Sequence, residues 1–304
     1  MKKILITGVN GFIGHTAAVY FGKEYEVYGM DISTEYRGIG EKVNYYQCNM
    51  SGNPAELSMI VSSIQPDVIL HCAGSANVAA SVVNPMADLD GNLHSLYQLL
   101  IALQSIQKKP KMIFMSSAGV YGNPKQLPMR ETDEPAPISP YGLHKLMCEQ
   151  LCHYYNEVHG YKIRSLRIFS AYGSGLRKQL LWDMYQKYQN QGAIPLFGTG
   201  DETRDYIHVL DIMQAIKCIL AYDGEEEIFN VANGEEVAIR ELAHIYAKQL
   251  GESEDIISFN GETKVGDPKN WRADISLLKK TGYQKSMKLE DGILDYVTWV
   301  KEQA

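Results

Sequence analysis

The 304-residue sequence lacks an excess of positive charge, because 36 acidic residues outnumber 29 basic ones and the net charge is −7. A protein that binds nucleic acid over a broad surface needs a basic footprint, so nucleic acid is not an expected partner. The sequence also lacks an apolar run of the roughly 20 residues that a membrane helix requires. We therefore expect no membrane association.

Cysteine is scarce: there are five residues and no CxxC pair. An odd number without paired spacing indicates neither a disulfide framework nor a zinc knuckle, and neither His144 nor His208 has partners at metal-ligand spacing. The basic start Met1–Lys3 is followed by a short apolar run that Gly8 interrupts, which is unlike a signal peptide. These features predict a cytoplasmic protein that holds no metal and keeps its cysteines reduced.

The first half of the chain alternates short β-rich runs with segments of helical spacing. This alternation predicts an α/β fold of the Rossmann type, with a doubly wound parallel sheet and helices on both faces. The expected strands are 3–7, 26–30, 43–48, 67–72, 111–117 and 162–169.

After Phe169 the alternation becomes irregular. Strands are expected near 194–198, 204–209 and 227–232, and helices near 209–222, 237–250 and 289–300. We predict a dinucleotide-binding domain at 1–169 that carries the catalytic residues. A smaller mixed α/β lobe at 170–304 would bind the substrate, and the chain is free to cross between the lobes more than once.

The stretch TGVNGFIG, from Thr7 to Gly14, places three glycines three residues apart directly after the first predicted strand. Gly8 would allow a tight turn, Gly11 would let the backbone approach a pyrophosphate, and Gly14 would let the next helix pack close to the sheet. The free N–H groups of that helix favour bound phosphates. An ordinary strand-to-helix turn would explain the glycines equally well if they stood alone.

A carboxylate supports the cofactor interpretation. Asp31 ends the second predicted strand, close to the interval of about 20 residues at which an acidic residue binds the adenosine ribose. Its charge would repel a 2′-phosphate, so we expect NAD rather than NADP. Arg37, a few residues on, is the one feature that argues the other way.

Three further residues can carry chemistry. Tyr141 and Lys145 lie four apart at the start of a predicted helix and therefore on one face, while Ser117 ends a predicted strand. An ammonium beside a phenol favours the phenolate, which makes Tyr141 a candidate general base. The Ser117 hydroxyl would hydrogen-bond the reacting oxygen.

This pattern resembles the extended branch of the short-chain dehydrogenase/reductase superfamily, which contains the NAD-dependent nucleotide-sugar epimerases and dehydratases. The resemblance covers nearly the whole chain. It rests on the glycine spacing and on HCAGSANVAASVVNP (71–85), DGNLHSL (90–96), SSAGVYG (116–122), SPYGLHKLMCEQ (139–150), RIFSAYG (167–173) and RDYIHVLDI (204–212).

The resemblance implies the roles of many residues. Ser117, Tyr141 and Lys145 would form the catalytic triad. The cofactor-binding residues would be Gly8, Asn10, Gly11, Phe12, Ile13, Gly14, Asp31, Ile32, Asn49, Met50, Cys72, Ala73, Gly74 and Asn92, together with Tyr141 and Lys145. The substrate-binding residues would be Ser75, Ser117, Ala118, Ser170, Arg204 and Lys264.

The implied reaction is epimerisation of a nucleotide-diphosphate sugar at C4 through a transient 4-keto sugar. Tyr141 would remove a hydroxyl proton while a hydride passes to NAD and later returns to the other face. Dehydratases of the family carry an acidic pair directly after the catalytic Ser or Thr. Here Ala118 and Gly119 follow Ser117, which favours the 4-epimerases.

Two alternatives remain open. Ser170 stands where many epimerases have an asparagine, Asn49 where they have an aspartate, and the loop after Tyr172 is short. A pocket altered in this way would suit a reductase of nucleotide-linked 4-keto-6-deoxy sugars that consumes NAD(P)H. A regulator that binds NAD(P) without catalysis is the third reading, and the complete triad disfavours it.

The remaining candidates have simpler interpretations. His144, His208, Cys148 and Cys152 are expected to be structural. In the resembling family, the helix that contains Tyr141 and the one after Asn92 pair across a two-fold axis, which implies a homodimer.

Overall fold

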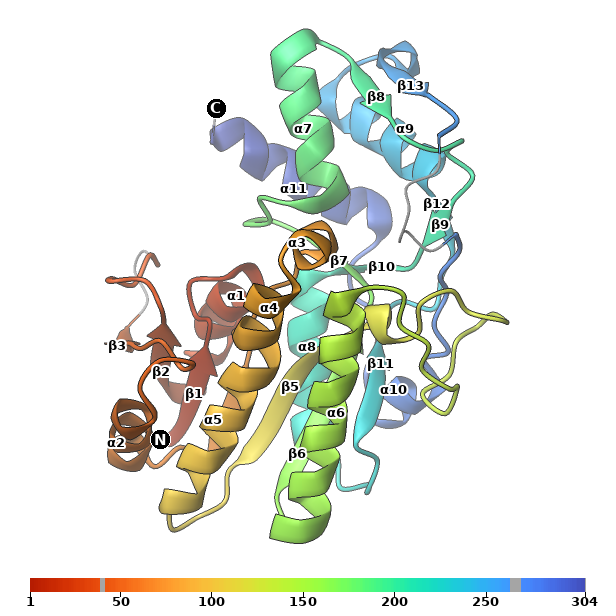
Figure 1. Cartoon of the computed structure of the whole chain (residues 1–304). Helices are drawn as coiled ribbons and strands as arrows, with labels where there is room; N and C mark the ends of the chain where they lie inside the picture. Colours follow the sequence, from red (N-terminus) through yellow and green to blue (C-terminus); the bar gives the residue numbers. More distant parts are fainter. Residues whose placement is uncertain (39–41, 263–268, 304) are drawn as a thin grey trace. The chain divides into compact units, whose positions relative to one another are not determined.

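A sheet of parallel strands organises the computed structural model, which describes residues 1–38, 42–262 and 269–303. Among these residues, seven strands form one sheet in the order β11-β6-β5-β4-β1-β2-β3 (Figure 1). From β3 to β6 all neighbours pair in parallel. The strands are β1 (Lys2–Thr7), β2 (Tyr25–Asp31), β3 (Val43–Gln47), β4 (Val68–His71), β5 (Lys111–Ser117), β6 (Lys162–Ile168) and β11 (Ile228–Val231). The predicted fold class is confirmed, because this is the order of doubly wound dinucleotide-binding folds.

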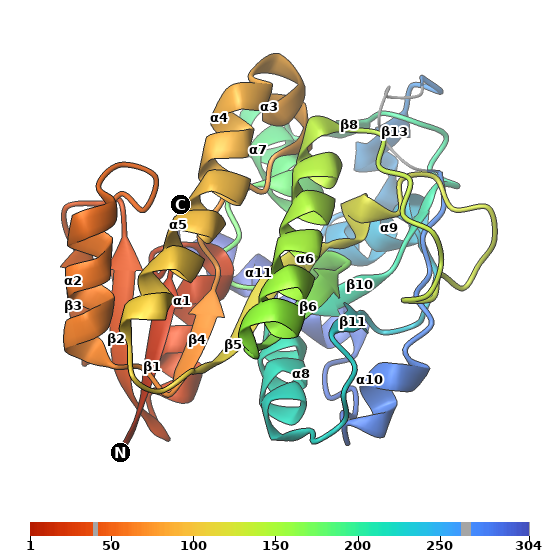
Figure 2. The same cartoon turned by 60° about the horizontal axis from the view of Figure 1, so that its bottom comes forward.

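Helices cover both faces of this sheet (Figures 1 and 2). The step from β1 to β2 runs in the opposite direction to the steps from β3 to β4, β4 to β5 and β5 to β6. Because crossovers are right-handed, α1 (Phe12–Phe21) lies on one face. On the other face lie α2 (Pro54–Ile64), α5 (Ser95–Ala102) and α6 (Pro140–His159). Apolar side chains of these three helices and of the strands form the main core there.

The last strand of the sheet is where the structure differs from the expectation for 227–232. This segment lies in the range expected for the substrate lobe, but β11 extends the parallel sheet beside β6. The Ser165 N–H donates to the Glu227 carbonyl at 2.7 Å, and the Phe169 N–H donates to the Val231 carbonyl at 3.1 Å. A short apolar run predicts that a strand forms, but it does not encode which distant strand is its partner. For this reason the position of β11 in the sheet could not be predicted.

Two compact units divide the described residues. Unit 1 comprises 1–122, 134–168 and 219–229, and unit 2 comprises 123–133, 169–218 and 230–304. The chain therefore passes between the units several times, with its main change at Ile168–Phe169. No helix in the described segments combines the length and apolar character needed to cross a membrane.

Unit 2 has short strand pairs in place of a large sheet: β7 with β10, β8 with β13 and β9 with β12. Their bounds are β7 (Ser170–Tyr172), β8 (Ile194–Leu196), β9 (Thr203–Arg204), β10 (Tyr206–His208), β12 (Val237–Ala238) and β13 (Ile257–Phe259). The helices in and at the border of this unit are α7 (Gln179–Gln191), α8 (Val209–Ala221), α9 (Ile239–Leu250), α10 (Ser276–Lys280) and α11 (Leu289–Glu302).

The buried carboxylate of Asp205 ties the loops of unit 2 together. It accepts the backbone N–H groups of Asn233 and Gly234 at 2.8 and 2.9 Å, and that of Ala273 at 3.1 Å. Three donors from two separate loops thus converge on the residue between β9 and β10. The mixed α/β lobe predicted for this half is therefore stabilised by polar contacts as well as by apolar packing.

A buried ion pair joins α6 to β5 and β6 inside unit 1. The guanidinium of Arg167 contacts Glu149 from Nη2 to Oε2 at 2.8 Å, and the Ser116 hydroxyl donates to Glu149 Oε1 at 2.5 Å. The Tyr121 ring lies 4.6 Å from the guanidinium carbon. Separating the three elements would leave a buried charge without its partner, which is energetically costly. The ion pair therefore fixes the distances between α6, β5 and β6.

Glu149→Gln should therefore destabilise unit 1 strongly, by about 3 kcal/mol, because Arg167 would remain buried without a counter-charge. Urea unfolding followed by circular dichroism measures this change. Lys187→Gln is the matched control, since it breaks the more exposed Lys187–Asp183 pair at 2.6 Å and should cost less than about 1 kcal/mol. Equal losses for the two variants would contradict the role given to Glu149.

Candidate functional site

The carboxyl ends of the strands border a cavity of about 410 Å³ in unit 1. Parallel pairing brings the ends of β1, β2, β3 and β4 to one edge, which is where open α/β sheets bind ligands. Many predicted cofactor residues line it: Gly8, Asn10, Gly11, Asp31, Ile32, Asn49, Met50, Cys72, Ala73 and Gly74. Phe12, Ile13, Gly14, Asn92, Tyr141 and Lys145 do not line this cavity.

Two glycines in the first turn are required by close backbone contacts. Gly8 has a φ of +66°, and a Cβ there would lie 2.7 Å from the backbone nitrogen of Ala73. A Cβ on Gly14 would collide with the carbonyl oxygen of Gly8, so α1 packs directly against the turn. Gly11 stands at the N-cap of α1 and borders the cavity. The free N–H groups at the start of α1 therefore fit a phosphate group.

Asp31 lies at the rim of this cavity at the end of β2. One of its oxygens accepts the Asn10 N–H at 3.0 Å and the other accepts the Ser33 N–H at 3.2 Å. Arg37 lines the same cavity, and its backbone N–H donates to Asn10 Oδ1 at 2.9 Å. The carboxylate and the arginine are thus both within the part of the cavity where an adenosine ribose would lie.

Asn92 is placed by an unusual turn of helix. It lies in a π-helical segment (Asp90–His94) that joins α4 (Pro85–Leu89) to α5, and its side-chain nitrogen donates to the Asp88 carbonyl at 3.0 Å. Its Oδ1 is buried and has no hydrogen-bond partner among the described residues. A Cβ on Gly74 would approach that oxygen to 2.5 Å. An orphaned buried acceptor beside a glycine turn fits a bound donor group.

Several residues that border the cavity were not found from the sequence. These are Met30, Ser33, Cys48, Ser51, Gly91 and Ser95. Ser51 donates to the Asp90 carbonyl at 2.9 Å and so connects the loop after β3 to the π-helical turn. Isolated serines carry no motif, so only the contacts between these two segments could have indicated them.

The predicted triad comes together in unit 1. The Ser117 hydroxyl, at the end of β5, hydrogen-bonds the Tyr141 side chain. Lys145 lies one turn further along α6, and its Nζ donates to the Met115 carbonyl at 2.9 Å. Only 8% of Tyr141 and 5% of Lys145 are exposed.

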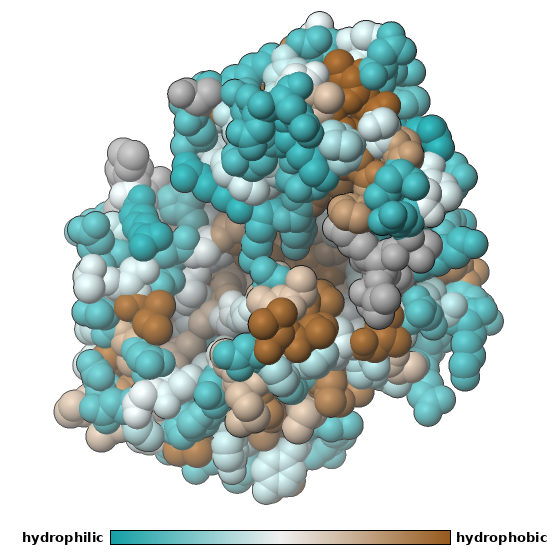
Figure 3. Space-filling view, turned by 45° about the horizontal axis from the view of Figure 1, so that its top comes forward, coloured by the Kyte–Doolittle hydropathy of each residue, from teal (hydrophilic) through white to brown (hydrophobic). Residues whose placement is uncertain are grey.

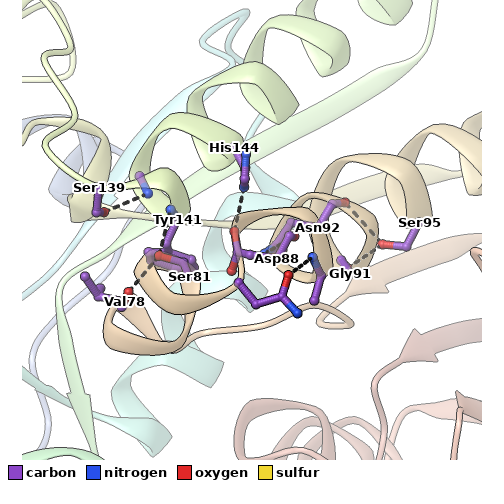
Figure 4. Close-up of polar contacts among 12 residues, drawn as sticks. Val78, Ser81, Asp88, Gly91, Asn92, Ser95, Ser139, Tyr141 and His144 are labelled. Carbon is purple, nitrogen blue, oxygen red and sulfur yellow. Dashed lines mark hydrogen bonds and ion pairs between the residues drawn. The ribbon is translucent and has the colours of Figure 1, made fainter.

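The start of α6 is capped from two sides, which orients Tyr141. Ser139 is the N-cap and accepts the Gly142 N–H at 3.1 Å. The Tyr141 N–H donates to Ser81 Oγ at 3.1 Å, and Ser81 in turn donates to the Val78 carbonyl at 2.7 Å (Figure 4). Ser81 belongs to α3 (Val78–Val83). The start of α6 is therefore held by a residue 60 positions earlier in the chain.

Burial dominates the electrostatics of the triad. It raises the pKa of Tyr141 to about 12, although the hydrogen bond with Ser117 lowers it. Burial also lowers the pKa of Lys145, while Cys148 and Asp88 oppose that shift. In the chain alone, desolvation disfavours the phenolate more than the chain's own groups stabilise it, and the expectation that Lys145 brings the phenol toward working pH stays a prediction.

The four residues expected to be structural are buried. His144 Nδ1 lies 2.6 Å from Asp88 Oδ2, and His208 Nε2 lies 3.3 Å from Asp295 Oδ2. Cys148 and Cys152 both belong to the apolar core under α6.

A second cavity, of about 720 Å³, lies within unit 2. Two predicted substrate residues, Ser170 and Arg204, line it. Arg204 Nη1 donates to the Thr203 carbonyl at 2.8 Å, and its guanidinium carbon lies 5.7 Å from the Trp271 ring. Other lining residues belong to no motif and were not expected here, including Gln179, Leu180, Phe197, Glu262 and Lys269.

The other predicted substrate residues are less well placed. Ala118 is fully buried, so its side chain faces no open space. Ser75 is half-buried in unit 1 and borders neither of the two cavities. Lys264 lies outside the described residues.

Comparison with known proteins identifies relatives of the whole chain. The model of the "NAD dependent epimerase/dehydratase family" matches residues 4–232. A putative UDP-glucose 4-epimerase of Methanocaldococcus jannaschii is 30% identical over 312 residues, covering 98% of each chain. The dTDP-4-dehydro-6-deoxyglucose reductase of Escherichia coli is 29% identical over 309 residues, covering 95% of each.

Solved structures of similar proteins have the same fold. A UDP-N-acetylglucosamine 4-epimerase from Methanobrevibacter ruminantium, in complex with UDP-N-acetylmuramic acid, has a TM-score of 0.91 and 26% identity, covering 100% of this chain and 99% of that one. The UDP-glucuronic acid 4-epimerase from Bacillus cereus, in complex with UDP-glucuronic acid and NAD, has a TM-score of 0.88 and 25% identity, covering 99% and 100%.

Asp31→Asn should weaken NAD binding about tenfold, because a neutral amide binds ribose hydroxyls less strongly than a carboxylate. The variant should also show a smaller preference for NAD over NADP, because the amide no longer repels a 2′-phosphate. Calorimetric titration with NAD and with NADP measures both effects. Glu35→Gln removes the same charge from a nearby exposed residue outside the cavity lining and should change neither. An unchanged NAD to NADP ratio in Asp31→Asn would show that this carboxylate does not discriminate between the cofactors.

Proposed function

This chain belongs to the NAD dependent epimerase/dehydratase family, and on that premise we propose that it epimerises a nucleotide-diphosphate sugar at C4. It is an enzyme of that family, and its cofactor is NAD. The observation that carries the proposal is the buried couple of Tyr141 and Lys145 with Ser117 hydrogen-bonded to the phenol. Ala118 and Gly119 follow Ser117, so the acid that dehydration needs is missing there.

The protein groups would move one proton while the sugar is oxidised and reduced again. NAD supplies the hydride acceptor and donor when it is bound. Tyr141 would take the proton from the 4-hydroxyl, and Ser117 would hydrogen-bond the same oxygen. After the keto sugar has turned over, Tyr141 would return the proton to that oxygen. One base would thus serve both half-reactions, and the proton and hydride balance is restored at the end of each turnover.

The phenol must become acidic for this step. With a pKa of about 12, Tyr141 holds its proton at neutral pH in the chain alone. The Ser117 hydrogen bond lowers that pKa, and any positive charge brought close to the phenol lowers it further. Burial keeps water away, which strengthens each of these interactions.

We propose that the cavity of unit 2 binds the nucleotide diphosphate. Arg204 offers a planar guanidinium and Lys269 an ammonium, which suit paired phosphate oxygens. Phe197 is 47% exposed at the same cavity and provides an apolar face for a base. The Ser170 side chain is shorter than the asparagine that many epimerases have at this position, so it would reach less far toward the sugar.

Reduction of a 4-keto-6-deoxy sugar is the second candidate function, and the Escherichia coli reductase similar to this chain supports it. A reductase needs the same triad but consumes one NAD(P)H per turnover. The two activities therefore differ in cofactor stoichiometry rather than in active-site residues.

The test incubates the protein with trace NAD and with UDP-glucose, UDP-N-acetylglucosamine or UDP-glucuronic acid. NMR of the mixture should show the C4 epimer of one of these sugars. Tyr141→Phe should lower kcat by about 10³-fold or more because the base is lost, and it should leave NAD affinity nearly unchanged. Turnover only with dTDP-4-keto-6-deoxyglucose and stoichiometric NAD(P)H would replace the epimerase by the reductase. No turnover of any sugar would overturn both.

We also propose that the chain forms a homodimer through α5 and α6. Figure 3 shows a mostly hydrophilic face on which hydrophobic residues form separate patches. Six large apolar side chains are exposed on α5 and α6: Tyr97, Ile101, Leu143, Met147, Tyr154 and Val158. Exposed apolar residues gathered on two helices favour contact with a second copy.

Ile101→Glu should convert the dimer into a monomer of 34.1 kDa, because a buried charge in the interface is costly. Light scattering after size-exclusion chromatography measures the mass. Leu294→Glu introduces the same charge at an exposed apolar position on α11 and should leave the dimer intact. A wild-type protein that is monomeric at every concentration refutes this proposal.

A further inference from the structure

A buried acid–base pair lies next to the triad and has no role in the reaction described above. His144 projects from α6 toward Asp88 on α4, and their Nδ1 and Oδ2 atoms are 2.6 Å apart (Figure 4). Both side chains are buried, with 7% of His144 and 2% of Asp88 exposed. His144 directly precedes Lys145 and lies three residues after Tyr141.

The pair has few other partners, so its charge is poorly compensated. Asp88 Oδ1 is buried and has no hydrogen-bond partner among the described residues. A buried carboxylate of this kind is strongly disfavoured unless a cation balances it. A protonated His144 is the nearest group that can do so. With that proton the pair is neutral overall, and without it the pair carries one negative charge.

The charge of Asp88 acts on the catalytic groups. Burial is the largest cause of the raised pKa of Tyr141, and the Ser117 hydrogen bond lowers that pKa. The charge of Asp88 raises it further. It also opposes the effect of burial on the pKa of Lys145. The titratable groups that interact electrostatically with Asp88 are Tyr141, Lys145 and Cys148, all on α6.

The same segment also fixes the backbone of Tyr141. Ser81 on α3 accepts the Tyr141 N–H, while Asp88 on α4 holds the side chain of His144 one turn later. The stretch from α3 to α4 thus contacts the first turns of α6 at two levels. One contact sets the position of Tyr141, and the other brings a charged pair close to it.

We propose that Asp88 and His144 are a positioning pair for Tyr141 and Lys145, in which a protonated His144 cancels the charge of Asp88 and so permits the phenolate to form. This inference rests on the proposed function, since it takes Tyr141 as the base. Neither residue touches the reacting atoms. They act through the placement of α6 and through the charge that Tyr141 experiences.

The test follows the titration of Tyr141 itself by NMR of protein labelled with ¹³C at the tyrosine ζ carbon, in the presence of saturating NAD. Tyr141→Phe assigns the signal by its disappearance. No sugar is needed, so the result does not depend on whether the epimerase proposal is correct. The pH profile of kcat for whichever UDP-sugar is turned over gives a second, independent readout.

His144→Gln keeps a donor for Asp88 but removes the positive charge, so the titration midpoint of Tyr141 should rise by about half a pH unit or more. Adding Asp88→Asn to this variant removes the uncompensated charge, and the midpoint should return to the wild-type value. Asp88→Asn alone should leave the midpoint at or below that value. A pair that serves only to pack α6 would give no such recovery in the double variant.

His153→Gln is the matched control, because His153 also lies on α6 and pairs with a carboxylate, Glu227, at 2.8 Å, but it is largely exposed. It should leave the Tyr141 midpoint unchanged. The proposal is overturned if His144→Gln does not shift the midpoint, or if the double variant shifts it further. If the Tyr141 midpoint shifts as expected in these variants but no sugar is turned over, the proposed function is refuted. The positioning role of Asp88 and His144 would then still hold.

Discussion

Parallel pairing of the strands in unit 1 is the constraint on which the site depends. Parallel strands all end at the same edge, so residues that follow β1, β2, β3 and β4 meet there although up to about 70 positions separate them in the chain. The glycine turn, Asp31, Asn49 and Cys72 border one cavity for this reason. The end of β5 places Ser117 at the same edge, where the first turn of α6 brings Tyr141.

Close backbone approach makes this edge compact. Gly8 has no room for a side chain because the turn after β4 lies against it, and Gly14 has none because α1 lies against Gly8. Tyr141 and Lys145 are buried as well, on a helix whose first turns contact α3 and α4. Desolvation then becomes the largest influence on Tyr141 and Lys145, so each neighbouring charge has a larger effect than it would in water.

The sequence predicted most strands of the sheet, and short motifs singled out Ser117, Tyr141 and Lys145, because strand periodicity and motifs are local. It did not place β11, whose partner β6 lies some 60 positions earlier, and it assigned no function to Ser51, Ser95 or Phe197. These residues have no motif, and their proximity to the cavities arises from contacts between distant segments. The effect of burial on the pKa of Tyr141 has no local signature either, because it arises from packing between distant segments.

By itself, the sequence determined the doubly wound fold, and it pointed to a dinucleotide turn and to Ser117, Tyr141 and Lys145 as the candidate triad. Periodicity, glycine spacing and residue type carry that information within a few turns of chain. Only the tertiary structure decided that Asp88 faces His144, that Ser81 caps the catalytic helix and that burial controls the phenol. Each of these depends on the distance between segments far apart in the chain, which no local pattern encodes.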